Sequence, residues 1–126
     1  MSRILVVDDD EQLGRSIGRI VQREGHEYRT AENLHAAVEN LAAYIPDLVI
    51  VELQPEWVSD LGPFRARLDQ AAGRRTPLIF TIGRRELFRP IGALATPGDD
   101  WAGKPIDPAE FAVRVARSLQ RCETNR

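Results

Sequence analysis

The sequence contains one cysteine, Cys122, and one lysine, Lys104, although it carries 16 arginines. A single cysteine excludes a disulfide within the chain, and a reducing cytoplasm is the simplest compartment for it. No apolar run approaches the roughly 20 residues that a membrane helix needs. Residues 1–7 form a segment that is too short to be a signal peptide, and acidic residues follow it directly. No glycine-rich loop follows the first apolar run, which argues against a nucleotide-binding enzyme.

Length and composition indicate one soluble globular domain. The 126 residues are 43% hydrophobic and 29% charged, which is enough to bury a core. The net charge of -2 is unevenly distributed: residues 1–63 hold 5 basic and 12 acidic side chains, whereas residues 64–126 hold 12 and 7. A basic half can mark a nucleic-acid surface. In residues 64–126 no aromatic side chains alternate with the basic ones. We therefore expect the basic side of the domain to face another protein and to make no direct nucleic-acid contact.

Apolar runs alternate with segments of helical period along the whole chain. Strands are expected at 4–7, 28–30, 48–51, 78–82 and 101–103. Helices are expected from 13 to Gly25, from 34 to Pro46, and over 57–68 with Pro63 in the first turn. Residues 83–97 should supply another helix, but Pro90 and Gly92 lie inside it. An interior proline costs about 3 kcal/mol, so we expect this fourth helix to be short, kinked or partly missing.

The last helix has a well-marked start. Asp107 is a favourable N-cap, Pro108 suits the first helical position, and Glu110 occupies the third. Three apolar residues at helical spacing form its expected buried face: Phe111, Val115 and Leu119. An arginine stripe forms its expected solvated face: Arg114, Arg117 and Arg121. Five successive strand–helix units therefore predict a single doubly wound α/β domain, with a five-stranded parallel sheet and helices on both faces.

Ligands of such sheets bind beyond the carboxyl ends of the strands, so the chemistry is expected there. The first strand is followed by Asp8, Asp9 and Asp10, and the third ends at Glu52. Converging carboxylates repel one another unless a cation is present, and a hard ion with oxygen ligands such as Mg²⁺ fits that need. Lys104, after the fifth strand, adds a compact positive charge. The alternative is that the acids only cap strand ends and the next helix, which is all we expect of Asp10.

Four segments, in this order and at this spacing, resemble the receiver domains of bacterial two-component response regulators: ILVVDDD (4–10), PDLVIVEL (46–53), TPLIF (76–80) and DDWAGKP (99–105). The resemblance covers essentially all of residues 1–126 and implies the flavodoxin-like (βα)5 fold. It also implies phosphoryl transfer from a histidine kinase to an aspartate that ends the third strand, with Mg²⁺ as cofactor. The chain is then either complete or the N-terminal receiver of a longer regulator.

The resemblance assigns roles residue by residue. Asp8 and Asp9 match the acidic pair that holds the metal together with the carboxylate at the end of the third strand. Lys104 matches the lysine that contacts the phosphoryl group. Pro105 matches a proline whose peptide bond is cis, and Trp101 matches an aromatic residue that changes rotamer on activation.

Three departures from the family pattern concern the switch itself. Glu52 stands at the phosphoacceptor position, where the family has aspartate, so the metal set becomes Asp8, Asp9 and Glu52. Pro55 follows after three residues rather than four, which shortens the loop. Ile82, followed by Gly83, replaces the hydroxyl residue that ends the fourth strand. Thr81 could replace it only after a shift in register, which would turn its side chain to the other face.

These departures favour a receiver whose phosphorylation switch is disabled or locked. The longer Glu52 side chain could pair directly with Lys104 in a charge-assisted contact, with or without Mg²⁺. We expect a phosphorylation-independent interaction module, or pseudo-receiver, that is not an enzyme and binds a histidine kinase or another signalling protein; homodimerisation stays open. The alternative is a working receiver that accepts phosphate on Glu52. A hydrolase is disfavoured, because His26 and His35 are expected on the surface, away from the strand ends.

Overall fold

The computed structural model describes residues 1–124, apart from the side chains of residues 87, 88 and 122–124, so the thiol of Cys122 lies outside the described part. Strands and helices alternate along the chain as expected. The elements are β1 (Arg3–Val7), α1 (Glu11–Arg23), β2 (Glu27–Ala31), α2 (Leu34–Asn40), β3 (Leu48–Glu52), η1 (Pro55–Asp60), α3 (Leu61–Ala72), β4 (Leu78–Ile82), η2 (Arg85–Leu87), α4 (Phe88–Leu94), β5 (Asp100–Gly103) and α5 (Pro108–Thr124).

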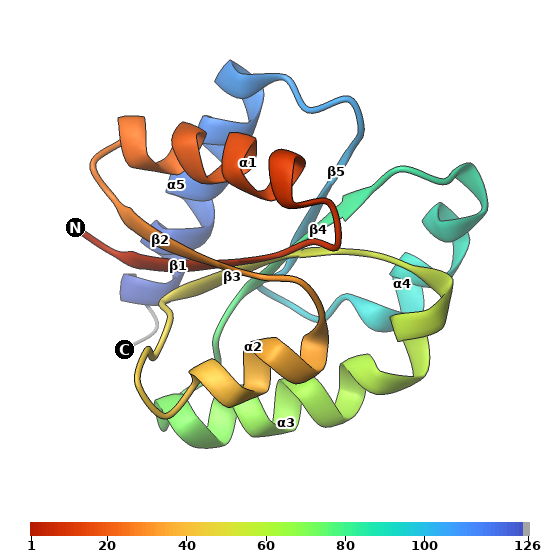
Figure 1. Ribbon diagram of the computed structural model, residues 1–126, viewed down its shortest axis with the longest axis horizontal. Helices are drawn as coiled ribbons and strands as arrows, with labels where there is room; N and C mark the ends of the chain where they lie inside the picture. Colours follow the sequence, from red (N-terminus) through yellow and green to blue (C-terminus); the bar gives the residue numbers. More distant parts are fainter. Residues whose placement is uncertain (125–126) are drawn as a thin grey trace.

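The strands form one parallel sheet in the order β2-β1-β3-β4-β5. Helices α1 and α5 cover one face, and α2, α3 and α4 cover the other, with α4 near the carboxyl ends of the strands (Figure 1). The predicted fold class, a doubly wound five-stranded flavodoxin-like domain, is therefore confirmed. Because the strand order reverses between β1 and β3, the crevice for a ligand lies at the carboxyl ends of these two strands.

The sheet separates two apolar cores. Val7, Val51 and Phe80 belong to the core beneath α2, α3 and α4, which also receives Ile91 of α4. Ile50 and Ile79 alternate with them and belong to the core beneath α1 and α5. Both core faces consist of side chains that are almost fully buried, as the continuous apolar runs in the sequence predicted.

Several element boundaries differ from the sequence-based expectation. Helix α2 ends at Asn40 and does not continue to Pro46, because residues 41–43 form turns before the chain enters β3. Trp57 is not in α3 but in the short 3₁₀ segment η1, while Pro63 lies in the first turn of α3 as predicted. Strand β2 is longer than the three residues expected, since pairing with β1 extends it to Glu27 and Ala31.

The fourth helix is short, as predicted. Helix α4 contains seven residues and follows the single 3₁₀ turn η2. Pro90 is the third residue of α4, where a helix makes no use of the missing backbone N–H. The proline is thus accommodated by a late helix start rather than by a kink.

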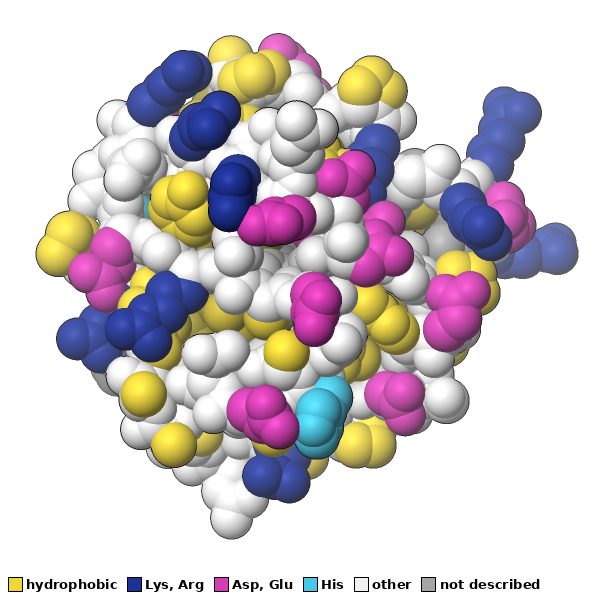
Figure 2. Space-filling view, viewed as in Figure 1, with side chains coloured by type: hydrophobic (Ala, Val, Ile, Leu, Met, Phe, Trp, Pro, Cys, Tyr) yellow, Lys and Arg dark blue, Asp and Glu magenta, His cyan; other side chains and the backbone are white. Residues whose placement is uncertain are grey.

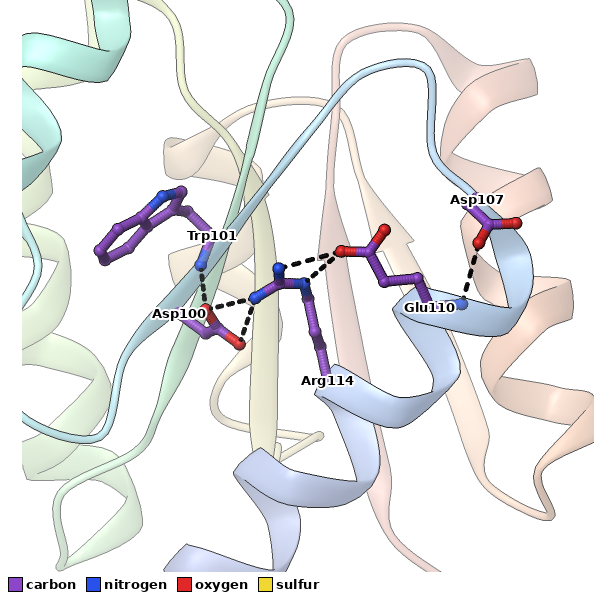
Figure 3. A network of polar contacts seen from close by, with 5 residues as sticks. All are labelled: Asp100, Trp101, Asp107, Glu110 and Arg114. Carbon is purple, nitrogen blue, oxygen red and sulfur yellow. Dashed lines mark hydrogen bonds and ion pairs between the residues drawn. The ribbon is translucent and has the colours of Figure 1, made fainter.

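Helix α5 begins as its sequence indicates, but its arginine stripe is not uniformly solvated. The Asp107 side chain accepts a hydrogen bond from the Glu110 backbone N–H at 3.3 Å, which is the expected N-cap. Arg114, however, reaches the Asp100 carboxylate of β5 at 2.9 Å and the Glu110 carboxylate at 2.9 Å (Figure 3). The prediction of a solvated face is therefore wrong for Arg114, which ties α5 to the edge strand. Arg117 and Arg121 are exposed.

Within the described residues, no helix combines the length and the apolar character needed to cross a membrane.

Candidate functional site

The strand order brings the predicted acids together at the carboxyl edge of the sheet. Asp8 directly follows β1, Glu52 ends β3, and these strands are neighbours. Lys104 directly follows β5, two strands away from β3. Its side chain must therefore pass the end of β4 to reach the acids. Gly83 lies at that point, where a Cβ would come within 3.3 Å of the Lys104 Cδ, so the absent side chain leaves room for the lysine stem.

Lys104 contacts both acids of this crevice. Its Nζ donates to Glu52 Oε1 at 3.0 Å and lies 3.5 Å from Asp8 Oδ2. The side chains of Lys104 and Glu52 are each 18% exposed, so the pair is partly shielded from solvent. A charge-assisted contact in such surroundings is stronger than the same contact at an open surface.

Glu52 is held in its ionised form by its neighbours. Burial raises the pKa of its carboxyl, but hydrogen bonds from Gln54 and Lys104 outweigh burial and lower this pKa to about 2. The Gln54 Nε2 donates to Glu52 Oε2 at 2.8 Å, so both carboxylate oxygens are engaged. Gln54 was missed by the sequence interpretation. Its position two residues after β3, in the shortened loop, is a signal that could have found it.

The pKa of Asp8 is shifted in the opposite direction to that of Glu52. Burial raises the pKa of its carboxyl to about 6, with the Glu52 carboxylate adding to the rise and the Asp10 backbone N–H opposing it. Asp8 Oδ1 accepts that N–H at 2.8 Å, whereas Oδ2 is buried and makes no hydrogen bond within the described residues. A negative charge on Asp8 is therefore only partly compensated by the protein itself.

A divalent cation fits this arrangement. Asp8, Asp9 and Glu52 each offer a carboxylate oxygen, and these oxygens lie within 4.8 Å of one another. Asp8 Oδ2, which has the Lys104 ammonium at 3.5 Å but no hydrogen bond in the described residues, and the all-oxygen donor set match the preference of Mg²⁺. The ammonium of Lys104 already neutralises part of this charge, so an ion here shares Glu52 with the lysine.

Besides Gly83, the predicted switch positions are Ile82 and Trp101, and they differ in their surroundings. Ile82 is 1% exposed and packs in the core beneath α2, α3 and α4, so it presents no polar group to the crevice. Trp101 is 41% exposed on β5, and its ring points away from Arg114 (Figure 3). The peptide bond between Lys104 and Pro105 is cis.

The side chain of Thr81 lies on a different face of the sheet from the one that the sequence interpretation assumed. It pairs in register with Glu52, and strand alternation puts both side chains on the face that carries Ile50 and Ile79. No shift in register is needed for Thr81 to share the face of Glu52. Its hydroxyl is nevertheless buried without a hydrogen-bond partner in the described residues, so it makes no hydrogen bond to Glu52.

The remaining candidates lie outside the crevice. Asp10 caps α1, because its side chain accepts from the Leu13 backbone N–H at 3.1 Å, as expected. His35 is exposed on α2, with its Nε2 3.0 Å from a Glu39 carboxylate oxygen. His26 is half-buried beside the chain start, where its Nδ1 accepts from the Ser2 backbone N–H at 3.2 Å. His26 is thus partly exposed, and among the described residues neither histidine makes a hydrogen bond or ion pair with Asp8, Glu52 or Lys104.

A basic segment borders the crevice. Arg84, Arg85 and Arg89 are all exposed, and a group of basic side chains projects from the right-hand side in Figure 2, where η2 and the start of α4 lie in Figure 1. Among the described side chains of this segment, the one ion pair is a long contact between Arg84 and Glu86 at 4.0 Å. The positive charge of the second half of the chain is therefore concentrated partly beside the acids of the first half.

A comparison with models of known protein families finds no match. Curated relatives are similar along nearly the whole chain. The uncharacterized transcriptional regulatory protein YvcP of Bacillus subtilis is 28% identical over 121 residues, which is 96% of this chain and 50% of YvcP. The phosphate regulon transcriptional regulatory protein PhoB of Rhizobium meliloti is 29% identical over 123 residues, which is 98% of this chain and 54% of PhoB. The chain spans about half the length of these relatives.

Solved structures share the fold. A response regulator receiver domain protein from Clostridium thermocellum has a TM-score of 0.78 at 17% identity, with both chains fully covered. The chemotaxis protein CheY4 of Vibrio cholerae has a TM-score of 0.75 at 21% identity, covering 94% of this chain and 98% of CheY4. The chain is thus similar in sequence to response regulators and shares the fold of solved receiver domains.

Proposed function

We propose that this receiver domain acts independently of phosphorylation, as a protein-interaction module held in one state by the contact between Glu52 and Lys104. One observation carries the proposal: Lys104 Nζ donates to Glu52 Oε1 at 3.0 Å. The lysine that the family uses to contact a phosphoryl group is thus already engaged by a carboxylate of the protein. Ile82, which ends the fourth strand, has no hydroxyl to offer a phosphoryl group, and the hydroxyl of Thr81 before it is buried without a hydrogen-bond partner in the described residues.

Mg²⁺ has a supporting place in this proposal. Asp8, Asp9 and Glu52 would hold the ion, and it would neutralise their mutual repulsion. The protein's own residues keep the carboxylate of Glu52 in place, through Gln54 on one oxygen and Lys104 on the other. The domain is proposed to have no enzymatic activity of its own, because neither His26 nor His35 lies near the crevice to serve as a base.

The test is incubation with acetyl phosphate or beryllofluoride in the presence of Mg²⁺. With acetyl phosphate we expect no phosphoryl adduct by intact-mass spectrometry. With either reagent we expect no change in tryptophan fluorescence. Trp57 would report a rearrangement of the crevice loop, because it lies in η1 directly after that loop. A receiver whose third strand ends in aspartate, treated in parallel, shows that the reagents are active. A stoichiometric adduct or a large fluorescence change would refute the proposal.

The second candidate is a working receiver with an acyl phosphate on Glu52. The specific observation in its favour is that Asp8, Asp9 and Lys104 still surround the Glu52 carboxylate. Glu52→Gln is the matched variant for this question, because it keeps the shape and removes the nucleophilic charge. An adduct that forms on the wild type and is lost in Glu52→Gln lies on Glu52 and supports this candidate. Partners under either candidate are a histidine kinase or another signalling protein.

A further inference from the structure

A groove of about 730 Å³ lies between α1 and the segment that joins β5 to α5, and we call it the α1 groove. Its apolar lining comes from Leu13 and Ile20 on one side and from Pro105 and Ile106 on the other. Its volume falls within the range of small-molecule sites, about 300–1,000 Å³. Size and lining therefore suit a compact apolar group rather than a polar ligand.

The charges around the α1 groove have one sign. Among the described residues that line it, every charged side chain is a cation: Arg19, Arg23 and Lys104. Arg19 and Arg23 are one helical turn apart on α1 and both are exposed. A concave, apolar site with only positive charges attracts anions and repels cations. The groove is thus matched to a ligand that is both apolar and anionic.

Lys104 belongs to two sites at once. It lines the α1 groove, and its Nζ donates to Glu52 in the crevice. The Lys104 side chain is only 18% exposed, so solvent screens its charge less than those of the exposed Arg19 and Arg23, but Glu52 and Asp8 offset this charge from the crevice side. An anionic group that enters the groove at this end competes with Glu52 for the lysine.

We propose that the α1 groove binds a small amphiphilic anion, whose apolar body lies against Leu13, Ile20 and Ile106 and whose anionic group contacts Lys104. The inference rests on the proposed function, in which the Glu52–Lys104 contact sets the state of the domain. The ligand weakens that contact by drawing Lys104 towards the groove. Ligand binding then has the regulatory place that phosphorylation has in other receivers.

The test uses two fluorescent probes with a similar apolar body and a different charge. Anilinonaphthalene sulfonate carries an anionic group, and phenylnaphthylamine lacks it. We expect saturable one-to-one binding of both probes, with the sulfonate bound about tenfold more tightly. Unsaturable binding, or equal affinity for the two probes, would overturn the inference.

Four variants locate the binding. Ile20→Glu places a carboxylate in the groove wall and should weaken the binding of both probes more than tenfold, and Ile106→Glu is the substitute if this variant does not fold. Lys104→Gln should abolish the preference for the sulfonate and keep the affinity for the uncharged probe. Arg117→Gln removes an exposed charge of α5 outside the groove lining and should change neither affinity. Unchanged binding in Ile20→Glu and Ile106→Glu would also contradict the proposed site.

Glu52→Gln tests the link between the two sites. Because it weakens the competitor for Lys104, it should bind the sulfonate several-fold more tightly and the uncharged probe as the wild type does. An unchanged affinity for the sulfonate would refute the competition for Lys104. These outcomes are separate from the phosphorylation test: an adduct with acetyl phosphate contradicts the proposed function, whereas failure of the probes contradicts only the groove ligand.

Discussion

The surroundings of Lys104 explain why this position holds a lysine in a chain whose other basic residues are arginines. Its stem passes the end of β4 beside Gly83 and brings a compact ammonium to Glu52 at 3.0 Å. A planar guanidinium needs a wider approach and prefers a bidentate geometry that this crevice, with Gln54 on the second Glu52 oxygen, does not offer. The residue type is therefore explained by the space and the donors around Glu52.

Asp8→Asn should stabilise the folded protein at neutral pH in the absence of Mg²⁺. The pKa of Asp8 is raised from 3.8 to about 6, so the folded protein holds this proton more tightly than the unfolded chain does. Ionisation of Asp8 therefore costs stability as pH rises from 3.8 through about 6. The asparagine variant avoids that cost, which is about 1–3 kcal/mol above about pH 7.

Urea unfolding as a function of pH measures this difference. The free energies of unfolding of the two proteins should converge below the unfolded pKa of Asp8, where both side chains are neutral. Mg²⁺ should stabilise the wild type and have a smaller effect on Asp8→Asn, which loses one of the three carboxylate ligands. A variant that is less stable than the wild type at neutral pH without Mg²⁺ would contradict the account of Asp8.

At the scale of elements, α1 lies so close to β2 that one glycine is required. A Cβ on Gly18 would come within 2.2 Å of the Tyr28 ring, whereas a Cβ on Gly14 would meet its neighbours at an ordinary 3.8 Å. Gly18→Ala should therefore destabilise the protein by about 1–3 kcal/mol through overpacking, despite the better helix propensity of alanine.

Gly14→Ala is the matched control in the same helix. With room for the methyl group, it should be neutral or stabilise the protein by up to about 1 kcal/mol, through helix propensity alone. Thermal unfolding followed by circular dichroism compares the two variants. Equal effects of the two substitutions would mean that the approach of α1 to Tyr28 is not tight.

Asp99 fastens the α4–β5 connection to the rest of the fold. Its side chain is 0% exposed, accepts from the backbone N–H groups of Leu78 and Thr96 at 2.9 Å, and forms an ion pair with Arg65 of α3. Asp99→Ala leaves these donors unsatisfied and the half-buried guanidinium of Arg65 without its partner. We expect a loss of about 3–5 kcal/mol in the free energy of unfolding, measured in urea.

Asp107→Ala serves as the comparison, because Asp107 is also an aspartate at an element boundary but is exposed. Loss of this α5 N-cap should cost about 1 kcal/mol. A comparable loss in the two variants would show that the Asp99 contacts do not hold the connection.

At the scale of the whole molecule, the two cores share one sheet and should unfold together. Val51 and Phe80 belong to one core and Ile50 and Ile79 to the other, yet they alternate along the same two strands. Neither core can open without losing the sheet that both cover. Unfolding transitions followed by far-ultraviolet circular dichroism and by tryptophan fluorescence should therefore coincide. Separate midpoints would show that the chain contains two independent units.

Much of the architecture could be predicted from local sequence. The apolar runs of β1, β3 and β4, the N-caps Asp10 and Asp107, and the short α4 all depend on neighbours within a few residues. Less could be predicted where long-range contacts decide, as at the end of α2, in η1 around Trp57, and for Arg114, which pairs with Asp100. Periodicity carries no information on such partners.

The sequence by itself determined the fold class and the residues available at the strand ends, because strand alternation, helix period and proline positions act locally. Only the tertiary structure decided how these residues meet. Glu52 and Lys104 are 52 positions apart, and their 3.0 Å contact depends on strand order, register and the gap left by Gly83. The same holds for Gln54 on Glu52 and for the α1 groove, since distances between side chains are set only when the sheet is assembled.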